Sequence, residues 1–150
     1  MAMKDALAEF HRIISDSSLR LGDISEADSG METSPGKWSR KQILGHLIDS
    51  ASNNHQRFVR AQVSDNPSLP GYEQNLWVDT QRYQAEPWEE LVSLWRSYNL
   101  HLLHVISSIP EEKLANRCSV GGGEPVTLKF LAEDYVRHLK HHLAQIFSRG

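Results

Sequence analysis

Residues 138 to 142 read HLKHH, three histidines within five positions of a segment with helical periodicity. Because successive residues of a helix turn by about 100°, His138 and His142 lie one above the other on a single face. Two imidazoles placed in this way can both reach one metal ion at about 2.0–2.1 Å. His141 falls on the polar side of the same segment. The spacing fits a metal site, and it also fits solvated histidines or core histidines with satisfied hydrogen bonds.

The apolar side of this segment predicts which rings turn inward. Its buried arc consists of Leu128, Leu131, Tyr135, Leu139 and Ile146. His142 falls inside this arc and His138 lies on its flank, so we expect both rings to point into the protein. Burying two imidazoles among apolar side chains is costly unless each nitrogen finds a partner, and a shared cation would supply one.

A third ligand would have to come from another part of the chain. A metalloprotease site of the HExxH type is excluded, because Leu139 stands where that motif requires glutamate. The other histidines are His11, His46, His55, His101 and His104. Three of them, His11, His101 and His104, are interpreted as surface residues.

His46 is harder to interpret. It lies outside the centre of the apolar arc of its segment and is aligned with Ser50, Asn53 and Arg57. This polar side either faces solvent or lines a polar pocket inside the protein. The spacing alone does not separate the two possibilities.

Four segments with helical periodicity must position these residues. They run from about residues 4 to 21, 39 to 62, 87 to 109 and 127 to 148. Ser39 is predicted to cap the second segment, with Trp38 as the apolar residue that precedes the cap. Thr127 or Glu124 lies near the cap of the fourth segment.

The apolar stripes of the two central segments are the best defined. In the second segment the stripe contains Ile43, Leu44, Leu47, Ile48, Ala51, Phe58 and Val59. In the third it contains Leu91, Leu94, Trp95, Tyr98, Leu102, Val105 and Ile109. Both stripes are predicted to face a common core.

The long connection over residues 64–86 contains three aromatic side chains and is predicted to pack on the body of the protein. The triplet GGG at 121–123 is interpreted as a turn, because no GxxxxGK[ST] sequence surrounds it. No segment shows sustained strand alternation. We therefore predict one all-α domain over residues 1–150, a four-helix bundle with a long crossover between helices two and three.

The composition is that of an ordinary soluble domain. The chain has 150 residues, a formal net charge of -3 and scattered Lys and Arg residues, so nucleic acid is excluded as an expected partner. Its apolar runs are far shorter than the roughly 20 residues of a membrane span, and no secretion signal is recognisable. A single cysteine, Cys118, excludes an intrachain disulfide. These features predict a cytoplasmic protein.

Two stretches of the chain resemble a known family. The sequence "WSRKQILGHLIDSASNNHQRF" resembles the second-helix signature of the DinB/YfiT-like superfamily of metalloenzymes, and "DYVRHLKHHLAQI" resembles its fourth-helix signature. The resemblance extends through "YEQNLW" and "PWEELVSLWRSYNLHLLHVISSIPEEKL", so it covers most of the chain from about Lys37 onward.

The resemblance implies a four-helix bundle that holds a divalent metal ion with three histidines. Carried onto this sequence, the ligands are His46, His138 and His142. It also implies a homodimer that acts on a small molecule. The activities it implies are those of thiol-dependent transferases, which use a low-molecular-weight thiol, or of metal-dependent hydrolases.

Three neutral ligands would leave an open position on the ion, and a water or thiol bound there would lose its proton readily. Imidazole suits several metals, and zinc or nickel is our prediction. Other side chains are expected to orient the rings or to line the pocket. The candidates are Asp49, Asp134 and Gln145 as ring partners, and Gln74 and Trp77 as a roof.

Two other classes of protein remain open at this stage. One is a module of the same fold that binds a metal or small ligand without turnover. The other is a helical interaction protein whose histidines bind nothing.

Overall fold

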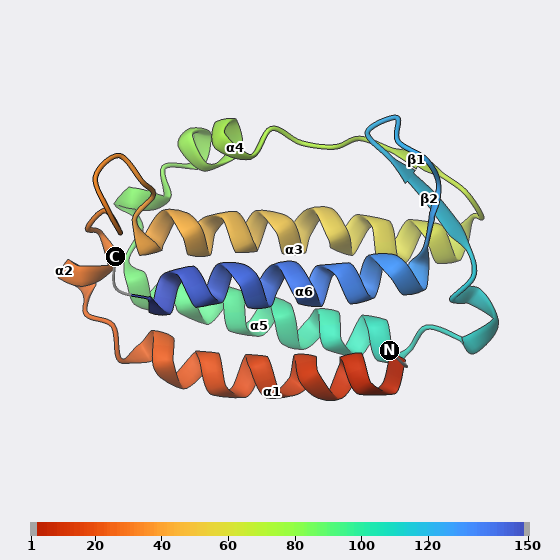
Figure 1. Ribbon diagram of the computed structural model, residues 1–150, viewed down its shortest axis with the longest axis horizontal. Coiled ribbons are helices and arrows are strands. Elements are labelled where there is room, and N and C mark those ends of the chain that lie inside the picture. Colours follow the sequence, from red (N-terminus) through yellow and green to blue (C-terminus); the bar gives the residue numbers. More distant parts are fainter. Residues whose placement is uncertain (1–2, 149–150) are drawn as a thin grey trace.

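A computed structural model describes residues 3–148, and the outermost residues of the predicted domain, 1–2 and 149–150, lie outside this range. Its long helices are α1 (Met3–Gly22), α3 (Arg40–Val63), α5 (Trp88–Ser107) and α6 (Leu128–Phe147). They lie side by side as a four-helix bundle, with the N-terminus and the C-terminus at opposite ends (Figure 1). The predicted all-α bundle is confirmed.

The order of the helices around the bundle was open in the sequence. Helix α3 packs against both α5 and α6, and α1 packs against the same two helices from the other side. The first two long helices of the chain, α1 and α3, are therefore diagonal partners. As a result, α3 presents one face to α5 and another to α6.

Local sequence signals explain where the helices of the site begin. Ser39 caps α3 in a capping box, in which its side chain accepts from the Gln42 backbone and the Gln42 side chain accepts from the Ser39 backbone. Thr127 caps α6 by accepting from the backbone N–H of Phe130. The predicted cap at Ser39 is confirmed, and of the two candidates for the fourth helix, Thr127 and Glu124, the structure selects Thr127.

The connections contain more regular structure than the sequence predicts. The first holds the short helix α2 (Glu26–Ser29). The long crossover holds strand β1 (Ser68–Leu69), helix α4 (Gln74–Gln81) and the 3₁₀ turn η1 (Tyr83–Ala85), and it runs back along α3 (Figure 1). After α5 come the 3₁₀ turn η2 (Glu111–Lys113) and strands β2 (Arg117–Val120) and β3 (Val126–Thr127).

The described part of the chain also contains short strands that the sequence does not predict. β2 lies between β1, to which it is parallel, and β3, to which it is antiparallel. These strands have two to four residues, too few for an alternating pattern to be visible in the sequence. The glycine triplet forms the turn between β2 and β3, as predicted, with positive φ at Gly121 and Gly122.

One hydrophobic core runs between the long helices. The predicted stripes supply most of it, including the fully buried Trp95 and Phe58. Two predicted members are exposed instead, Val59 at 41% and Leu94 at 46%, because they lie at the edge of their stripes rather than at the centre. Within residues 3–148 no helix has the length and apolar character that a bilayer span needs.

Candidate functional site

His46 lies on α3 with its side chain inside the bundle, where only 3% of the residue is exposed. The centroid of its ring lies 5.4 Å from that of Trp38 and 4.7 Å from that of His142. Its Nδ1 atom is buried and has no hydrogen-bond partner among the described residues. At this position the polar side of α3 faces the interior, not solvent.

His138 and His142 lie one turn apart on α6, with ring centroids separated by 6.4 Å. His142 is half-buried, and its Nδ1 lies 3.0 Å from Oε1 of Gln145, one of the predicted ring partners. His138 is exposed, so the prediction that both rings point inward is wrong for this residue. The buried arc of α6 extends through Ala132 and Leu143, on the side away from His138.

The histidines affect one another's protonation. Burial, followed by the neighbouring His142 and His138, lowers the pKa of His46 from 6.5 to about 4. Burial also lowers the pKa of His142, while its hydrogen bond to Gln145 acts in the opposite direction. Both rings are therefore neutral at neutral pH, which is the form of imidazole that binds a metal ion.

This arrangement fits a divalent cation. A buried ring nitrogen without a partner costs free energy, so the orphaned Nδ1 of His46 points to a missing ligand. The Gln145 amide oxygen can only accept, which places the proton of His142 on Nδ1 and leaves the lone pair on Nε2. Two rings bound tetrahedrally to one ion at about 2 Å would have centroids about 5 Å apart, close to the 4.7 Å between His46 and His142.

The third ring, that of His138, does not meet that geometry. Within residues 3–148 no three His, Cys, Asp or Glu side chains are arranged closely enough to hold an ion as they stand. His138 is the ring that would have to move toward the other two. Because it is exposed, its side chain can rotate at little cost in packing.

Asp49 lies one turn after His46 on α3 and is only 2% exposed. Its Oδ1 accepts hydrogen bonds from the hydroxyl of Tyr83 at 2.6 Å and from the side-chain amide of Gln81 at 2.8 Å. Its Oδ2 is buried without a partner among the described residues. Burial raises the pKa of Asp49, and the hydrogen bonds from Tyr83 and Gln81 oppose this. The sequence predicts a partner for an imidazole here, whereas the structure shows a carboxylate that ties the crossover to α3.

The contact between the crossover and α3 depends on Gly45. A Cβ atom added at this position would lie 2.1 Å from Cδ2 of Tyr83, so any larger residue would displace the tyrosine ring. Glycine inside a helix costs about 1 kcal/mol relative to alanine, which makes Gly45 a signal that the sequence did carry. Sequence analysis missed Gly45, Gln81 and Tyr83 as parts of the site.

Two cavities adjoin these residues. One, of ≈ 620 Å³, has Trp38, Asn75 and Gln145 in its wall and so reaches the neighbours of both His46 and His142. The other, of ≈ 850 Å³, is lined by the crossover, from Gly71 to Gln81. The larger cavity is not the one nearest the histidines, but Gln81 connects it to Asp49. Both are within the size range of small-molecule pockets.

The remaining predicted residues of the site lie in different surroundings. Trp77 packs on Tyr72, with ring centroids 5.1 Å apart, and forms part of the wall of the larger cavity. Gln74 is exposed at the start of α4, and its neighbour Asn75 lines the smaller cavity instead. Asp134 pairs with Arg137 at 3.1 Å, so it is committed to a partner other than an imidazole.

Comparison with known proteins gives consistent descriptions. A family model described as the DinB superfamily matches residues 9–146. A protein of Geobacillus thermodenitrificans named "Putative metal-dependent hydrolase" is 27% identical over 114 residues, which are 75% of this chain and 64% of that protein. A similarly named protein of Oceanobacillus iheyensis is 24% identical over 111 residues, 74% of this chain and 64% of that protein. The chain thus spans a little under two thirds of the length of these relatives.

Two solved structures share the fold. YfiT from Bacillus subtilis, described as "a probable metal-dependent hydrolase with an unusual four-helix bundle topology", matches with a TM-score of 0.86 at 16% identity, over 96% of this chain and 83% of YfiT. A mycothiol-dependent maleylpyruvate isomerase matches with a TM-score of 0.80 at 13% identity, over 99% of this chain and 62% of the isomerase. At these identities the likeness shows the fold alone.

Proposed function

The chain belongs to the DinB superfamily, and from this premise we propose that it is a metal-dependent enzyme in which His46, His138 and His142 hold one divalent ion, zinc or nickel. The observation that carries the proposal is the buried His46 ring, with an unpartnered nitrogen, 4.7 Å from the ring of His142. The names of its curated relatives support a metal-dependent activity.

The chemistry of the site follows from its ligands. When bound, a divalent ion held by three neutral imidazoles supplies Lewis acidity and lowers the pKa of a water molecule or thiol in its open position. No carboxylate is part of this ligand set, so the positive charge of the ion is not compensated by its protein ligands.

The other side chains of the site have separate tasks. Gln145 holds the ring of His142 by accepting its Nδ1 proton, and Trp38 shields the ring of His46 from solvent. Asp49 keeps one buried carboxylate oxygen, Oδ2, without a partner among the described residues. Tyr83 and Gln81 position that carboxylate through its other oxygen.

The substrate is proposed to be a small molecule that enters through the cavity beside Trp38 and Gln145. Two reactions are open to this site, each with a different nucleophile that the bound ion would acidify. A thiol-dependent transferase would attack an electrophile with a thiolate, and the mycothiol-dependent structural neighbour favours this reading. A hydrolase would attack an ester or amide with an activated water, and the relatives' names favour that one. A homodimer in the cytoplasm stays a prediction.

The first experiment measures metal content. Protein purified without a metal-affinity step should contain about one divalent ion per chain by elemental analysis. His46→Ala and His142→Ala should lose it, whereas His11→Ala, an exposed histidine on α1, should keep it. Wild-type protein that takes up no zinc or nickel would overturn the proposal.

The second experiment measures turnover. Bacillithiol, mycothiol and glutathione are each offered with a generic electrophile, in parallel with ester and amide substrates. A rate that requires both a thiol and the metal supports the transferase, and a metal-dependent rate without thiol supports the hydrolase. Stoichiometric metal with no rate in either assay would leave a binding module in place of an enzyme.

A further inference from the structure

Three histidines outside the proposed site also lie close together. His55 is on α3 and His101 and His104 are on α5. The centroids of the His55 and His101 rings are 5.3 Å apart, and those of His101 and His104 are 6.3 Å apart. His55 follows His46 by nine residues, or two and a half turns, so the two rings leave α3 on opposite faces. His46 faces α6, and His55 faces α5.

The ring of His55 is already oriented by a neighbour. Its Nδ1 lies 2.9 Å from the hydroxyl oxygen of Tyr98. When Nδ1 carries the proton and donates it to this oxygen, Nε2 keeps the lone pair that a metal ion needs. Burial and the nearby His101 lower the pKa of His55, so the ring is neutral at neutral pH. The same device, a hydrogen bond on one ring nitrogen, holds His142 in the proposed site.

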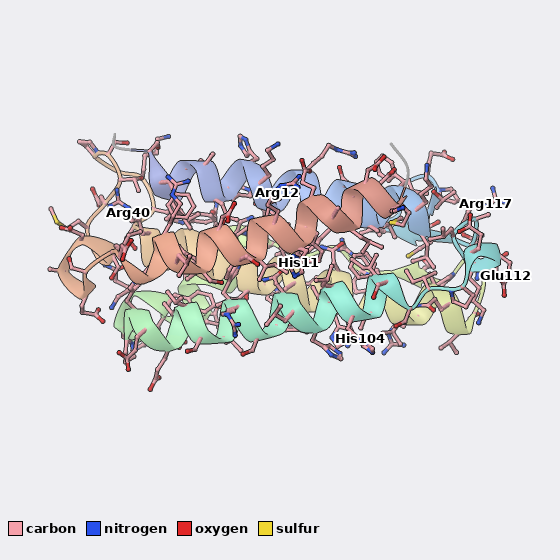
Figure 2. The ribbon with its side chains drawn as sticks, turned by 90° about the horizontal axis from the view of Figure 1, so that it is seen from below. His11, Arg12, Arg40, His104, Glu112 and Arg117 are labelled. Atoms are coloured by element: carbon pink, nitrogen blue, oxygen red, sulfur yellow. The ribbon has the colours of Figure 1, made fainter. Side chains whose placement is uncertain are left out.

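The two histidines of α5 are accessible from solvent. His101 and His104 are both exposed and occupy successive turns of α5. His104 projects outward from α5, away from α1 (Figure 2). None of the three is in an ion pair with an Asp or Glu among the described residues. These rings therefore have no competing charged partner in the part of the chain that the structure describes.

We propose that His55 and His101, joined by His104, form a second binding site for a divalent transition-metal ion, which bridges α3 and α5. The 5.3 Å between the first two centroids is close to the roughly 5 Å expected for two imidazoles on one tetrahedral ion. His104 reaches the ion by rotation of its exposed side chain, and water completes the coordination. Zinc, nickel and copper(II) are the ions whose preference for imidazole matches this ligand set.

This second site does not depend on the proposed function. It binds more weakly than the buried site, because at least two of its ligands lose rotamer freedom when they bind. It also exchanges its ion freely with solvent. Since its ligands come from two helices, an ion bound there stabilises the packing of α3 on α5.

The test is a calorimetric titration of metal-free protein with zinc chloride. Wild-type protein should bind two zinc ions, one in each binding event: the first, tighter event at the buried site and the second at the site of His55 and His101. His101→Ala should lower the affinity of the second event by at least tenfold and leave the first unchanged. His46→Ala should weaken only the first event. Tyr98→Phe, which removes the partner of the His55 ring, should weaken the second event by about tenfold. His11→Ala is the matched control and should behave as wild type.

The outcomes separate this inference from the proposed function. The inference is overturned if no binding of zinc below 1 mM is weakened in His101→Ala. This limit corresponds to about 4 kcal/mol in binding free energy. Loss of the first event with the second retained would instead count against the proposed function alone. Far-UV circular dichroism of each variant shows that the helices are retained.

Discussion

The two histidine groups have almost the same internal spacing. The group around the buried His46, which we call the buried group although His138 is exposed, has centroid distances of 4.7 Å between His46 and His142 and 6.4 Å between His142 and His138. In the exposed group the corresponding distances are 5.3 Å and 6.3 Å. Each combines one ring from α3 with two rings from successive turns of a neighbouring helix. Ring spacing alone would not distinguish one group from the other.

Their surroundings do distinguish them. His46 is inside the core, with one nitrogen unpartnered and a pKa lowered to about 4. In the exposed group, His55 is half-buried with its Nδ1 bonded, and both histidines of α5 face solvent. Helix geometry sets the spacing of the rings, whereas burial sets the cost of leaving them without a ligand. The comparison predicts that substitutions near the buried group cost more stability than substitutions near the exposed group.

The largest effect should come from Gly45→Ala. Because the added Cβ would lie 2.1 Å from Tyr83, the ring must leave α3 and release its hydrogen bond to Asp49. We expect a loss of about 2–3 kcal/mol in the free energy of unfolding, measured with urea. Gly22→Ala is the matched control, since nothing lies within 4 Å of its Cβ, and it should change stability by no more than about 0.5 kcal/mol. Equal effects in the two variants would contradict a tight contact at Gly45.

The next largest difference is expected between two tyrosines, Tyr83 beside Asp49 and Tyr98 beside His55. Tyr83→Phe removes a 2.6 Å buried hydrogen bond to a carboxylate and should cost about 2 kcal/mol. Tyr98→Phe removes a 2.9 Å bond to a half-buried imidazole and should cost about 0.5 kcal/mol. Urea unfolding at neutral pH in the absence of metal measures both. If Tyr98→Phe were the more damaging, the contrast between the two regions would not hold.

The pH dependence of stability provides a third comparison. The pKa of His46 is about 4 in the folded protein and 6.5 when unperturbed, so above pH 6.5 the ring is neutral in both states. As pH falls from 6.5 to about 4, only the unfolded chain binds a proton at this residue, and stability is lost. After a discount for solvent screening, the loss is about 1–2 kcal/mol in metal-free protein.

Replacing the histidine should remove this part of the acid sensitivity. Unfolding of metal-free His46→Gln, followed between pH 7 and pH 4, is expected to show a shallower decline than wild type. His11→Gln tests whether the loss of any histidine has the same result. A His46→Gln profile parallel to that of wild type would mean that His46 is not the buried neutral ring of the structure.

The smallest effect is expected for Asp134→Ala. Asp134 forms a 3.1 Å pair with Arg137 on the outer side of α6, and such pairs contribute little. Stability should change by no more than about 0.5 kcal/mol, and metal content should not change. Loss of the ion in this variant would show that Asp134 orients a histidine, as the sequence suggested and the structure does not show.

The parts of the fold that depend on local chemistry could be predicted. Ser39 caps its helix where the sequence places it, and Thr127 is one of the two candidates predicted for the fourth helix, because a cap needs only a side-chain oxygen and the next turn of backbone. The i, i+4 relation of His138 and His142 is equally local. The prediction that His138 points inward was wrong, because the neighbouring helices decide which residues of α6 are buried.

The contacts of the crossover could not be predicted. Gly45, Tyr83 and Asp49 meet only because the chain returns along α3 after a long connection, and no periodicity relates residues so far apart. The second histidine group was missed for the same reason. His101 and His104, taken one at a time, are ordinary surface residues of α5, and only the packing of α5 on α3 brings His55 to them.

By itself the sequence determined four amphipathic helices, their caps and which histidines share a helical face, because these depend on propensity and on the 3.6-residue turn. Only the tertiary structure decided which helices are neighbours, and therefore that α3 carries one histidine toward α6 and another toward α5. Burial is a property of the assembled bundle. It lowers the pKa of His46 and leaves one nitrogen of that ring without a partner among the described residues, while the histidines of α5 stay near solvent.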